Sequence, residues 1–587
     1  MSRSRCATGG VEVVAAPRRL LPLCLGLTLA ACAPEPEATP SCPDLPIPPQ
    51  AFHTGGDVGI DRGALAADLR LPTLDGEPFV LSEAWTGCDV FVFMPDVDGS
   101  SGRFVDSMWL DDHLALLQAS PDHVHWVFFS DQPDARQRAS ALKRRFDALR
   151  NPRRADFDGR LHFIARPVSD TQGWLAEKYA RSGYGFAIGL DQRIRDIGSL
   201  ADPDRFSQAA GWFGPNMAMA ANEAVYLRYL AEREAEVTSE RVGIVRIIDE
   251  EQTGGGTFDV SMPEGFAEAP FSRLELDLTQ DCTDPVREFG SCPEWDYLAN
   301  LWVCGLDPSD ADFTDAPCDA ATEDTPASTL PCLCDGPGDV QTPSERTCRA
   351  DGTGYADCAC DCIEVGRWIT TYHREGRWIS DATHALPLLR QPTVRFRYNG
   401  GNSYLTTLDL RLSTDGRAAG RPAGLVPLFK GGRFDPNYND GREPITVPIP
   451  ADATRVELVA LITGHGFGQD AANCAEFCNH THHFTVNGAP FVKEHPEADD
   501  PLGCVKDVAA GTVPNQFGTW FFGRGGWCPG QRVDPFVADV TAALTPGAEA
   551  TLTYEGKLAG EPYDPAPREG EGFSARIDLE SYLLIWR

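Results

Sequence analysis

Hydrophobic positions follow two different patterns along the chain. Between about residues 59 and 240, short apolar runs at 90–94 and 124–129 are separated by stretches with helical spacing, such as 104–117. Continuous apolar runs are typical of strands buried on both faces of a mostly parallel sheet. A strand-turn-strand pattern follows at 186–195. The alternation of strands and helices predicts an α/β domain over residues 59–240.

From about residue 255 the chain changes to short alternating strands with Gly and Pro turns. Leu274, Leu276 and Leu278 alternate with polar residues, and 456–463 and 581–586 are apolar enough for sheet interiors. This texture predicts antiparallel β-sandwiches. We expect the first over residues 255–423 and the second over residues 424–587.

An insert rich in cysteine interrupts the first predicted sandwich at residues 304–362. It is nearly devoid of large apolar residues, so it cannot build a core of its own. It contains Cys304, Cys318, Cys332, Cys334, Cys348, Cys358, Cys360 and Cys362. We expect four disulfides of unassigned connectivity, and a zinc site at the last three cysteines is the alternative.

The first residues predict export. Arg18 and Arg19 precede an apolar run at 20–30, which ends in Leu-Ala-Ala-Cys at Cys32. This ending resembles a bacterial lipoprotein signal, in which the cysteine carries the lipid. We therefore expect residues 1–31 to be removed, Cys32 to be lipidated and residues 32–58 to form a Pro-rich tether. The resemblance implies an exported protein, lipid-anchored to the bacterial outer membrane or cell surface.

Charge and cysteine content agree with that location. Removal of residues 1–31 takes away four arginines and one glutamate, so the formal charge falls from −35 to −38. Nucleic acid is an unsuitable partner for such an acidic chain. Of 19 cysteines, two leave with the signal and Cys32 takes lipid, which leaves 16. An even number in an exported chain predicts disulfides.

The stretch 473–487 concentrates groups that could carry chemistry. Cys474 and Cys478 are one helical turn apart, a spacing that a disulfide spans, and Glu476 lies on the loop they would close. The following residues alternate as a strand and run into Asn487-Gly488, a strong hairpin signal. The sequence thus presents a carboxylate at the end of a strand.

The α/β segment resembles the thioredoxin and peroxiredoxin fold over roughly 150 residues. After the first core strand, where such proteins keep Cys-x-x-Cys, this chain has Asp-Val-Asp-Gly-Ser-Ser-Gly at 96–102. Because the reactive thiolate is absent, we expect a redox-inactive scaffold or docking domain. Cys88 precedes that strand and is a structural cysteine, with Cys42 as its candidate partner.

Five motifs in the second half together resemble the peptide-N-glycosidase F family. They are Cys-Pro-Glu-Trp-Asp at 292–296, Gly-Arg-Trp-Ile-Thr at 366–370, Gly-His-Gly at 464–466, Cys-Ala-Glu-Phe-Cys at 474–478 and Gly-Trp-Cys-Pro-Gly at 526–530. The resemblance covers about residues 255–587 and implies two eight-stranded jelly-roll domains. It also implies hydrolysis of the amide bond between N-acetylglucosamine and asparagine in N-glycosylated proteins or glycopeptides, without a metal or other cofactor.

The resemblance also suggests roles for individual residues. Asp296 matches the essential aspartate of the family, Glu476 its second catalytic carboxylate, and Arg524 an arginine near it. Hydrolysis of an amide needs a base for the attacking water and a proton for the leaving amine. We therefore expect Asp296 to activate water, Glu476 to position it and shuttle the proton, and Arg524 to orient Glu476 or the oxyanion.

Candidate substrate contacts and disulfides complete this expectation. The substrate-binding candidates are Glu294, Trp295, Asn399, His465 and Trp527. Three of the matched positions depart from the family. Asn399 lies closest to the position of a third glutamate in the family, His465 replaces a tryptophan, and Tyr297 replaces an arginine. The expected disulfides join Cys282 to Cys292, Cys474 to Cys478 and Cys504 to Cys528.

Two other functions remain open. A protein of the same fold that has lost catalysis would bind glycans or act in surface interactions, and Asn399, which cannot act as a base, favours this alternative. The architecture also resembles copper-dependent peptide-hydroxylating monooxygenases, and His480, His482 and His483 lie on one predicted strand, with His465 close in sequence. Residues i and i+2 of a strand point the same way and can share a metal. The first sandwich has only His373 and His384 for a second metal.

Overall fold

The computed structural model divides the chain at Pro40, and residues 41–587 form one compact unit. The described residues are Cys42, 47–55, 58–96, Trp109, 113–182, 185–196, 213–239, 242–284, 291–293, 295–304, 362–514 and 520–587, with three short strands of the insert, β13 (Leu330–Cys332), β14 (Ser344–Cys348) and β15 (Tyr355–Ala356). The predicted signal, Cys32, Glu294, residues 97–102 and four of the eight insert cysteines (Cys318, Cys334, Cys358 and Cys360) lie outside them.

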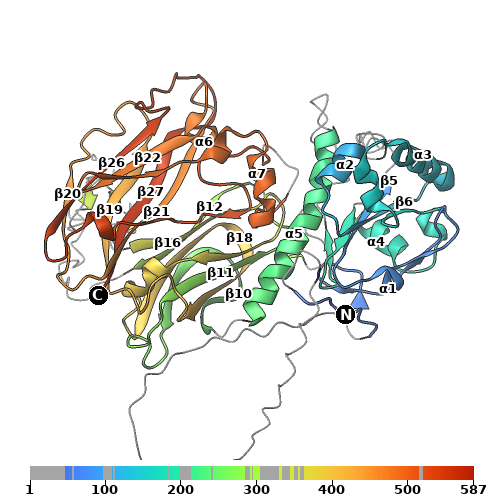
Figure 1. Cartoon of the computed structure of the whole chain (residues 1–587), viewed down its shortest axis with the longest axis horizontal. Helices are drawn as coiled ribbons and strands as arrows, with labels where there is room; N and C mark the ends of the chain where they lie inside the picture. Colours follow the sequence, from blue (N-terminus) through green and yellow to red (C-terminus); the bar gives the residue numbers. More distant parts are fainter. Residues whose placement is uncertain are drawn as a thin grey trace, which may run out of the picture. The chain divides into compact units, whose positions relative to one another are not determined.

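Residues 58–196 form an α/β region around one five-stranded sheet (Figure 1). The strand order is β7 (Leu161–Phe163), β6 (Val124–Ser130), β5 (Val90–Asp96), β8 (Phe186–Ile188) and β9 (Ile194–Asp196). The first three strands are parallel, and β8 and β9 pair antiparallel as a hairpin. Every residue of β5 and β6 is buried, because apolar clusters cover both faces of the sheet.

Helices and two minor strand pairs complete this region. They are β1 (Val58–Gly59), β2 (Leu65–Ala66), β3 (Arg70–Leu71), β4 (Phe79–Val80), α1 (Leu81–Ala84), α2 (His113–Ala119), α3 (Ala135–Ala148) and α4 (Leu175–Ser182). On α3, Ala135, Ala139, Leu142 and Phe146 form the buried stripe, as the helical spacing predicts. A disulfide joins Cys42 to Cys88.

The 27-residue helix α5 (Phe213–Ser239) follows the α/β sheet and touches two cores. Ala224 and Leu227 pack into the α/β core, whereas Tyr226 packs into the core of the first β region. Arg374, beyond β16, is buried and pairs with Glu223 on α5 (2.6 Å). Buried apolar and charged groups therefore fix α5 to the first β region.

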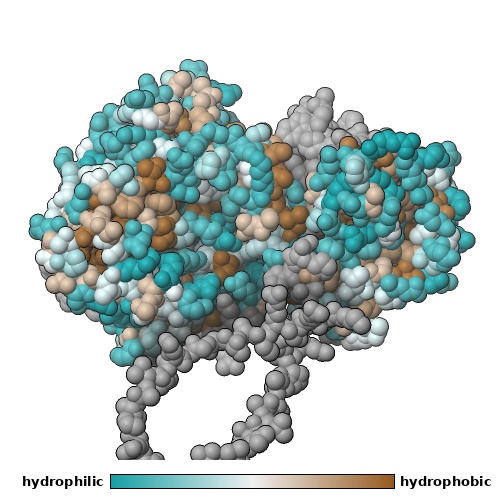
Figure 2. All heavy atoms as spheres, in the orientation of Figure 1, coloured by the Kyte–Doolittle hydropathy of each residue, from teal (hydrophilic) through white to brown (hydrophobic). Residues whose placement is uncertain are grey.

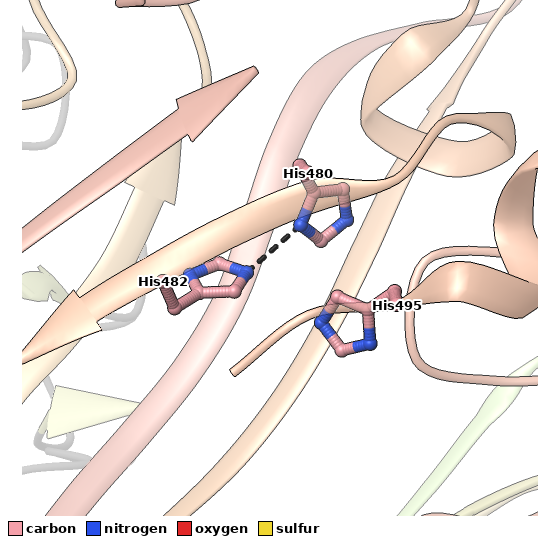
Figure 3. Close-up of side chains that lie close together, drawn as sticks. All are labelled: His480, His482 and His495. Carbon is pink, nitrogen blue, oxygen red and sulfur yellow. Dashed lines mark hydrogen bonds between the residues drawn. The ribbon is translucent and has the colours of Figure 1, made fainter. Parts of the chain in front are cut away.

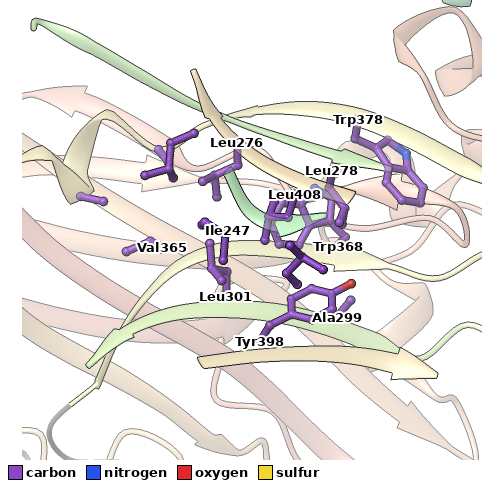
Figure 4. Close-up of a cluster of buried hydrophobic side chains, with 14 of the residues drawn as sticks. Ile247, Leu276, Leu278, Ala299, Leu301, Val365, Trp368, Trp378, Tyr398 and Leu408 are labelled. Carbon is purple, nitrogen blue, oxygen red and sulfur yellow. The ribbon is translucent and has the colours of Figure 1, made fainter. Parts of the chain in front are cut away.

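The first β region contains one seven-stranded sheet. Its strands are β10 (Gly243–Ser261), β11 (Arg273–Asp281), β12 (Leu298–Cys304), β16 (Cys362–Ile369), β17 (Gly376–Asp381), β18 (Thr393–Ser413) and β24 (Gln531–Arg532). All named pairings are antiparallel, and the long strand β18 pairs with β10, β11 and β12. Inward side chains, including Leu276, Trp368 and Trp378, converge in one apolar core (Figure 4).

The C-terminal β region is a sandwich of two four-stranded sheets. One sheet contains β19 (Gly424–Arg433), β21 (Arg455–Phe467), β25 (Phe536–Asp539) and β27 (Phe573–Trp586); the other contains β20 (Ile445–Pro448), β22 (His480–Val486), β23 (Ala489–Lys493) and β26 (Glu549–Leu558). Side chains of both sheets meet in a shared core. Short helices α6 (Cys474–Phe477) and α7 (Gly503–Lys506) lie in the connecting segments.

The two β regions share a buried interface. Leu461 on β21 packs with Ile369 on β16, so β21 is covered on both faces. The buried guanidinium of Arg367 pairs with Glu364 and donates to Oγ1 of Thr463 (2.8 Å). Strand β24 also crosses from the C-terminal segment to pair with β16. A site at this interface would therefore have both walls fixed by packing.

The mostly antiparallel β architecture predicted for the second half is confirmed. Where the sequence predicts the first sandwich, the strands pair into one seven-stranded sheet, because the long strand β18 pairs with β10, β11 and β12. The visible surface is largely hydrophilic, as expected from the acidic composition (Figure 2). Among the described residues, no helix has the length and apolarity that a membrane crossing needs.

Candidate active site

Asp296 lies on a turn that leads into β12 and is held by a strand of the same sheet. Thr370, which directly follows β16, donates from Oγ1 to the carbonyl oxygen of Trp295 (2.7 Å) and accepts from the backbone N–H of Tyr297 (2.9 Å). Trp295 has a positive φ of 77°, which is uncommon for a non-glycine residue. These bonds fix the backbone on both sides of Asp296.

Glu476 lies on α6, inside the loop closed by the Cys474–Cys478 disulfide. Asn473 begins this short helix in the left-handed conformation, with φ of 52°. The Glu476 side chain is buried, and its Oε2 accepts a hydrogen bond from the backbone N–H of Gly466 (3.2 Å). The carboxylate therefore points at the end of β21, as the sequence motif suggests.

Arg524 lies between the two carboxylates. Its Nε is 3.3 Å from Oε1 of Glu476, and its Nη2 is 3.8 Å from Oδ2 of Asp296. Its Nη1 donates to the carbonyl oxygen of Phe522 (3.0 Å), and the guanidinium lies 4.7 Å from the ring centre of Trp527. The structure thus brings together, around one buried cation, the three residues for which the sequence suggests catalytic roles.

Burial controls the protonation of both carboxyl groups. Desolvation raises the pKa of Glu476 to about 7, although Arg524 and the Gly466 N–H lower it and the charge of Asp296 raises it further. Desolvation also raises the pKa of Asp296, against the lowering effects of Arg524 and of a hydrogen bond with Tyr372. The side chain of Asp296 is 20% exposed and that of Glu476 is 7% exposed. Solvent therefore reaches Asp296 more readily.

Tyr372 is a neighbour of the site that the sequence analysis missed. It is buried, and its hydroxyl forms a hydrogen bond with Asp296. Burial, followed by the charge of Asp296, raises the pKa of Tyr372. Its ring also packs edge-on against Trp295, with ring centres 6.4 Å apart. In the sequence it lies 76 positions after Asp296 and just beyond the motif at 366–370, so no local signal identifies it.

The two candidate sugar-stacking tryptophans have opposite environments. Trp295 is 56% exposed, whereas Trp527 is 4% exposed. The indole N–H of Trp527 donates to the carbonyl oxygen of Gly464 (2.7 Å), and its ring also packs 5.1 Å from that of His465. Trp295 therefore offers an open aromatic face, while Trp527 supports the loop that carries Arg524.

The side chains of Asn399 and His465 both form hydrogen bonds within the protein. Asn399 on β18 donates to the carbonyl oxygen of Leu298 (3.2 Å) and accepts from the N–H of Gly401 (3.1 Å). His465 is buried, and its Nε2 lies 2.9 Å from Oγ1 of Thr463 and 3.8 Å from Asp578. Burial, opposed by Asp578, lowers the His465 pKa to about 4. Asn399 is exposed, and its side chain bonds to Leu298, the first residue of the strand that follows Asp296.

Disulfides surround the site. The structure joins Cys282 to Cys292, Cys474 to Cys478 and Cys504 to Cys528, the three expected pairs. A further bridge joins Cys304 to Cys362 at the base of the insert. The first pair precedes the Asp296 turn, the second encloses Glu476, and the third encloses Arg524.

The histidines of β22 form a separate cluster (Figure 3). His480 and His482 point to the same side and are buried, and their rings meet through Nδ1 and Nε2 at 2.8 Å. His483 alternates to the other face of the strand and contacts Oγ1 of Thr481, so it does not join them. Its place is taken by His495, which follows β23 and was not a predicted ligand. Among the described residues, these three buried rings form the group that could hold a metal ion.

Comparison with known proteins agrees with the motifs. The family model for "Peptide-N-glycosidase F, C terminal" matches residues 435–584. Peptide-N(4)-(N-acetyl-beta-D-glucosaminyl)asparagine amidase F of Elizabethkingia miricola is 32% identical over 117 residues, which are 19% of this chain and 30% of that protein. The chain thus aligns with less than a third of the length of this relative.

Two solved structures are also similar. PNGase F, a glycosylasparaginase from Flavobacterium meningosepticum, has 17% identity and a TM-score of 0.38, covering 59% of this chain and 96% of that one. PNGF-II has 13% identity and a TM-score of 0.40, covering 60% and 67%. In sequence, residues 435–584 of this chain thus match the C-terminal domain of the peptide-N-glycosidase F family.

Proposed function

We propose that this protein hydrolyses the amide bond between N-acetylglucosamine and asparagine in N-glycosylated proteins or glycopeptides. The observation that carries the proposal is the position of Arg524, which lies beside Asp296 from one β region and Glu476 from the other. The family match of residues 435–584 supports the same activity. The two carboxylates differ in exposure, as expected of groups that exchange protons with different partners.

In the proposed reaction, Asp296 takes a proton from a water molecule, whose oxygen attacks the side-chain amide carbon. The carbon–nitrogen bond then breaks, and the glycosylamine nitrogen receives the proton held by Glu476. Asparagine becomes aspartate, and the glycan leaves as its amine. With its pKa raised to about 7 by burial, Glu476 is poised to hold a proton near neutral pH. Arg524 stabilises the carboxylates as they exchange charge.

The test is mass spectrometry of a defined N-glycopeptide incubated with the mature protein in heavy-oxygen water. Release of the intact glycan, with one heavy oxygen in the new aspartate, supports the proposal. Asp296→Asn is expected to abolish release, since it removes the base but keeps the shape. Asp259→Asn is the matched control, because Asp259 forms a surface ion pair with Arg395 on β18. Full activity of Asp296→Asn would contradict the assignment of the base.

Loss of catalysis with retained glycan binding is the second candidate function. It is favoured by Asn399, whose amide is occupied by backbone groups and cannot act as a base. Binding of the glycopeptide without conversion, measured by calorimetry across several glycan types, would support this function. A metal-dependent oxidation product would instead support the copper-dependent monooxygenase alternative.

For the remainder of the chain we propose supporting roles. The five-stranded sheet of the α/β region is consistent with a thioredoxin-like scaffold, and its lack of Cys-x-x-Cys supports docking rather than redox chemistry. We also propose export and attachment of Cys32 to lipid at the bacterial outer membrane or cell surface. Metabolic labelling with a fatty acid, compared between the natural chain and Cys32→Ser, tests the anchor.

A further inference from the structure

His480, His482 and His495 form a compact group of nitrogen donors behind the candidate active site. One nitrogen from each ring lies within 4.8 Å of one from each of the others. The rings are 0%, 0% and 2% exposed. Burial also lowers the pKa of all three, so they are held as neutral imidazoles, the form that binds metals.

Hydrogen bonding leaves this cluster incompletely satisfied. Nε2 of His495 is buried and has no hydrogen-bond partner among the described residues. Nε2 of His480 faces the carbonyl oxygen of Ala475 without the geometry of a full hydrogen bond. Because a carbonyl only accepts, the ring hydrogen of His480 belongs on Nε2, which leaves a lone pair on Nδ1. A buried nitrogen without a partner is costly, and a cation bound at Nε2 of His495 would remove that cost at this ring.

A contact outside the cluster orients the ring of His482 as at known metal sites, and another holds the backbone of His495. Nδ1 of His482 lies 2.7 Å from the hydroxyl of Tyr554, which also contacts the hydroxyl of Tyr438 (2.7 Å). The backbone N–H of His495 donates to Oδ1 of Asn479 (2.7 Å). Metal-binding histidines usually direct their other nitrogen to such a partner, which fixes the ring. His480 Nδ1 and His482 Nε2 are the nitrogens left facing each other (Figure 3).

We propose that His480, His482 and His495 bind one zinc or copper ion that supports the two loops of the candidate site. Three imidazoles without a carboxylate suit these metals and not calcium or magnesium. The burial of the rings favours a supporting role over turnover. This site is distinct from the proposed amidase residues and does not depend on their activity.

The link to the active-site loops is direct contact. A Cβ added to Gly525, the residue after Arg524, would lie 2.2 Å from Nε2 of His480, and one added to Gly526 would lie 2.7 Å from Cε1 of His495. The Ala475 carbonyl belongs to α6, next to Glu476. The histidines therefore pack against both the loop that carries Arg524 and the helix that carries Glu476. Metal bound there would restrict the movement of both.

The experiment measures metal content of the mature protein, after dialysis against Zn²⁺ or Cu²⁺ and removal of free metal. About one ion per chain is expected, with its loss in His482→Gln and His495→Gln. His483→Gln is the matched control, since His483 lies on the same strand but faces away. Asp296→Asn should bind metal normally, which separates this result from failure of the amidase proposal.

X-ray absorption distinguishes this site from the cysteine-rich insert. Nitrogen ligands at about 2.0 Å are expected here, whereas cysteine ligands would lie at about 2.3 Å. The melting temperature should rise with added metal in the natural chain and in His483→Gln but not in His495→Gln. Absence of uptake, sulfur ligation, or equal metal loss in His483→Gln would overturn the proposal.

Discussion

The hydroxyl of Thr370 donates a hydrogen bond of 2.7 Å to the carbonyl oxygen of Trp295. The hydroxyl oxygen of Thr370 also accepts a hydrogen bond from the backbone N–H of Tyr297 (2.9 Å), so one buried side chain brackets the backbone of Asp296. The position of the candidate base therefore depends on Thr370, a residue at the end of a neighbouring strand, which holds the residues on both sides of Asp296.

Thr370→Val should lower both stability and the rate of glycan release. The valine matches the shape but leaves a part-buried N–H and a carbonyl without this partner, at a cost of about 1 kcal/mol. Thr370→Ser keeps the hydroxyl and should retain most activity. Calorimetric melting and kcat on a glycopeptide measure the two effects. Equal activity of the valine and serine variants would show that the bracket does not position Asp296.

Glu476 should make stability fall as pH rises. Burial raises its folded pKa from 4.5 to about 7, so between these values the folded protein keeps a proton that the unfolded chain has lost. Stability is then lost as pH rises through about 7, by about 3 kcal/mol from this group. Glu476→Gln removes this contribution, and its stability should depend less on pH over that range.

Urea denaturation at a series of pH values measures this difference. Glu555→Gln is the control, because Glu555 is a surface residue paired with Lys557 and should leave the pH dependence unchanged. If Glu476→Gln and the natural chain lost stability in parallel between pH 4.5 and about 7, the carboxyl would not hold its proton as the burial implies.

Local patterns predicted the parts of the fold whose cause is local. The apolar runs at 456–463 and 581–586 become the interior of β21 and β27, which lie side by side in one sheet. Asn487-Gly488 forms the β22–β23 turn, with positive φ at both residues. One helical turn between Cys474 and Cys478 is enough to place their disulfide.

Contacts between distant segments were not predictable in this way. Asp296 precedes β12 and Tyr372 follows β16. The two residues meet because these strands pair, in a register that no local pattern encodes. Proximity in sequence groups His483 with His480, but alternation along the strand places them on opposite faces. His495, which follows the hairpin, joins the cluster instead. The motifs likewise do not predict that Trp527 is buried and Trp295 is exposed.

Trp295 and Trp527 should respond differently to truncation. Trp295→Ala removes an exposed ring and should raise KM for the glycopeptide with little change in melting temperature, as expected of a side chain that stacks on sugar. Trp527→Ala removes a buried ring and should cost about 3–5 kcal/mol of stability. Steady-state kinetics and thermal melting separate the two. An unchanged KM in Trp295→Ala would exclude it from the substrate site.

The two disulfides nearest Glu476 and Arg524 should affect stability and activity in opposite order. The Cys474–Cys478 bridge spans 4 positions and the Cys504–Cys528 bridge 24, so loss of chain entropy in the unfolded state gives about 2 and about 3.5 kcal/mol. Paired substitution to alanine should therefore destabilise the second more. Relative to its stability cost, the first pair should lose more kcat, because Glu476 lies inside the small loop and needs it to face Arg524. Denaturation midpoints, and kcat at a temperature where both variants stay folded, test this order. A variant without the Cys474–Cys478 bridge that loses stability but keeps its kcat would contradict it.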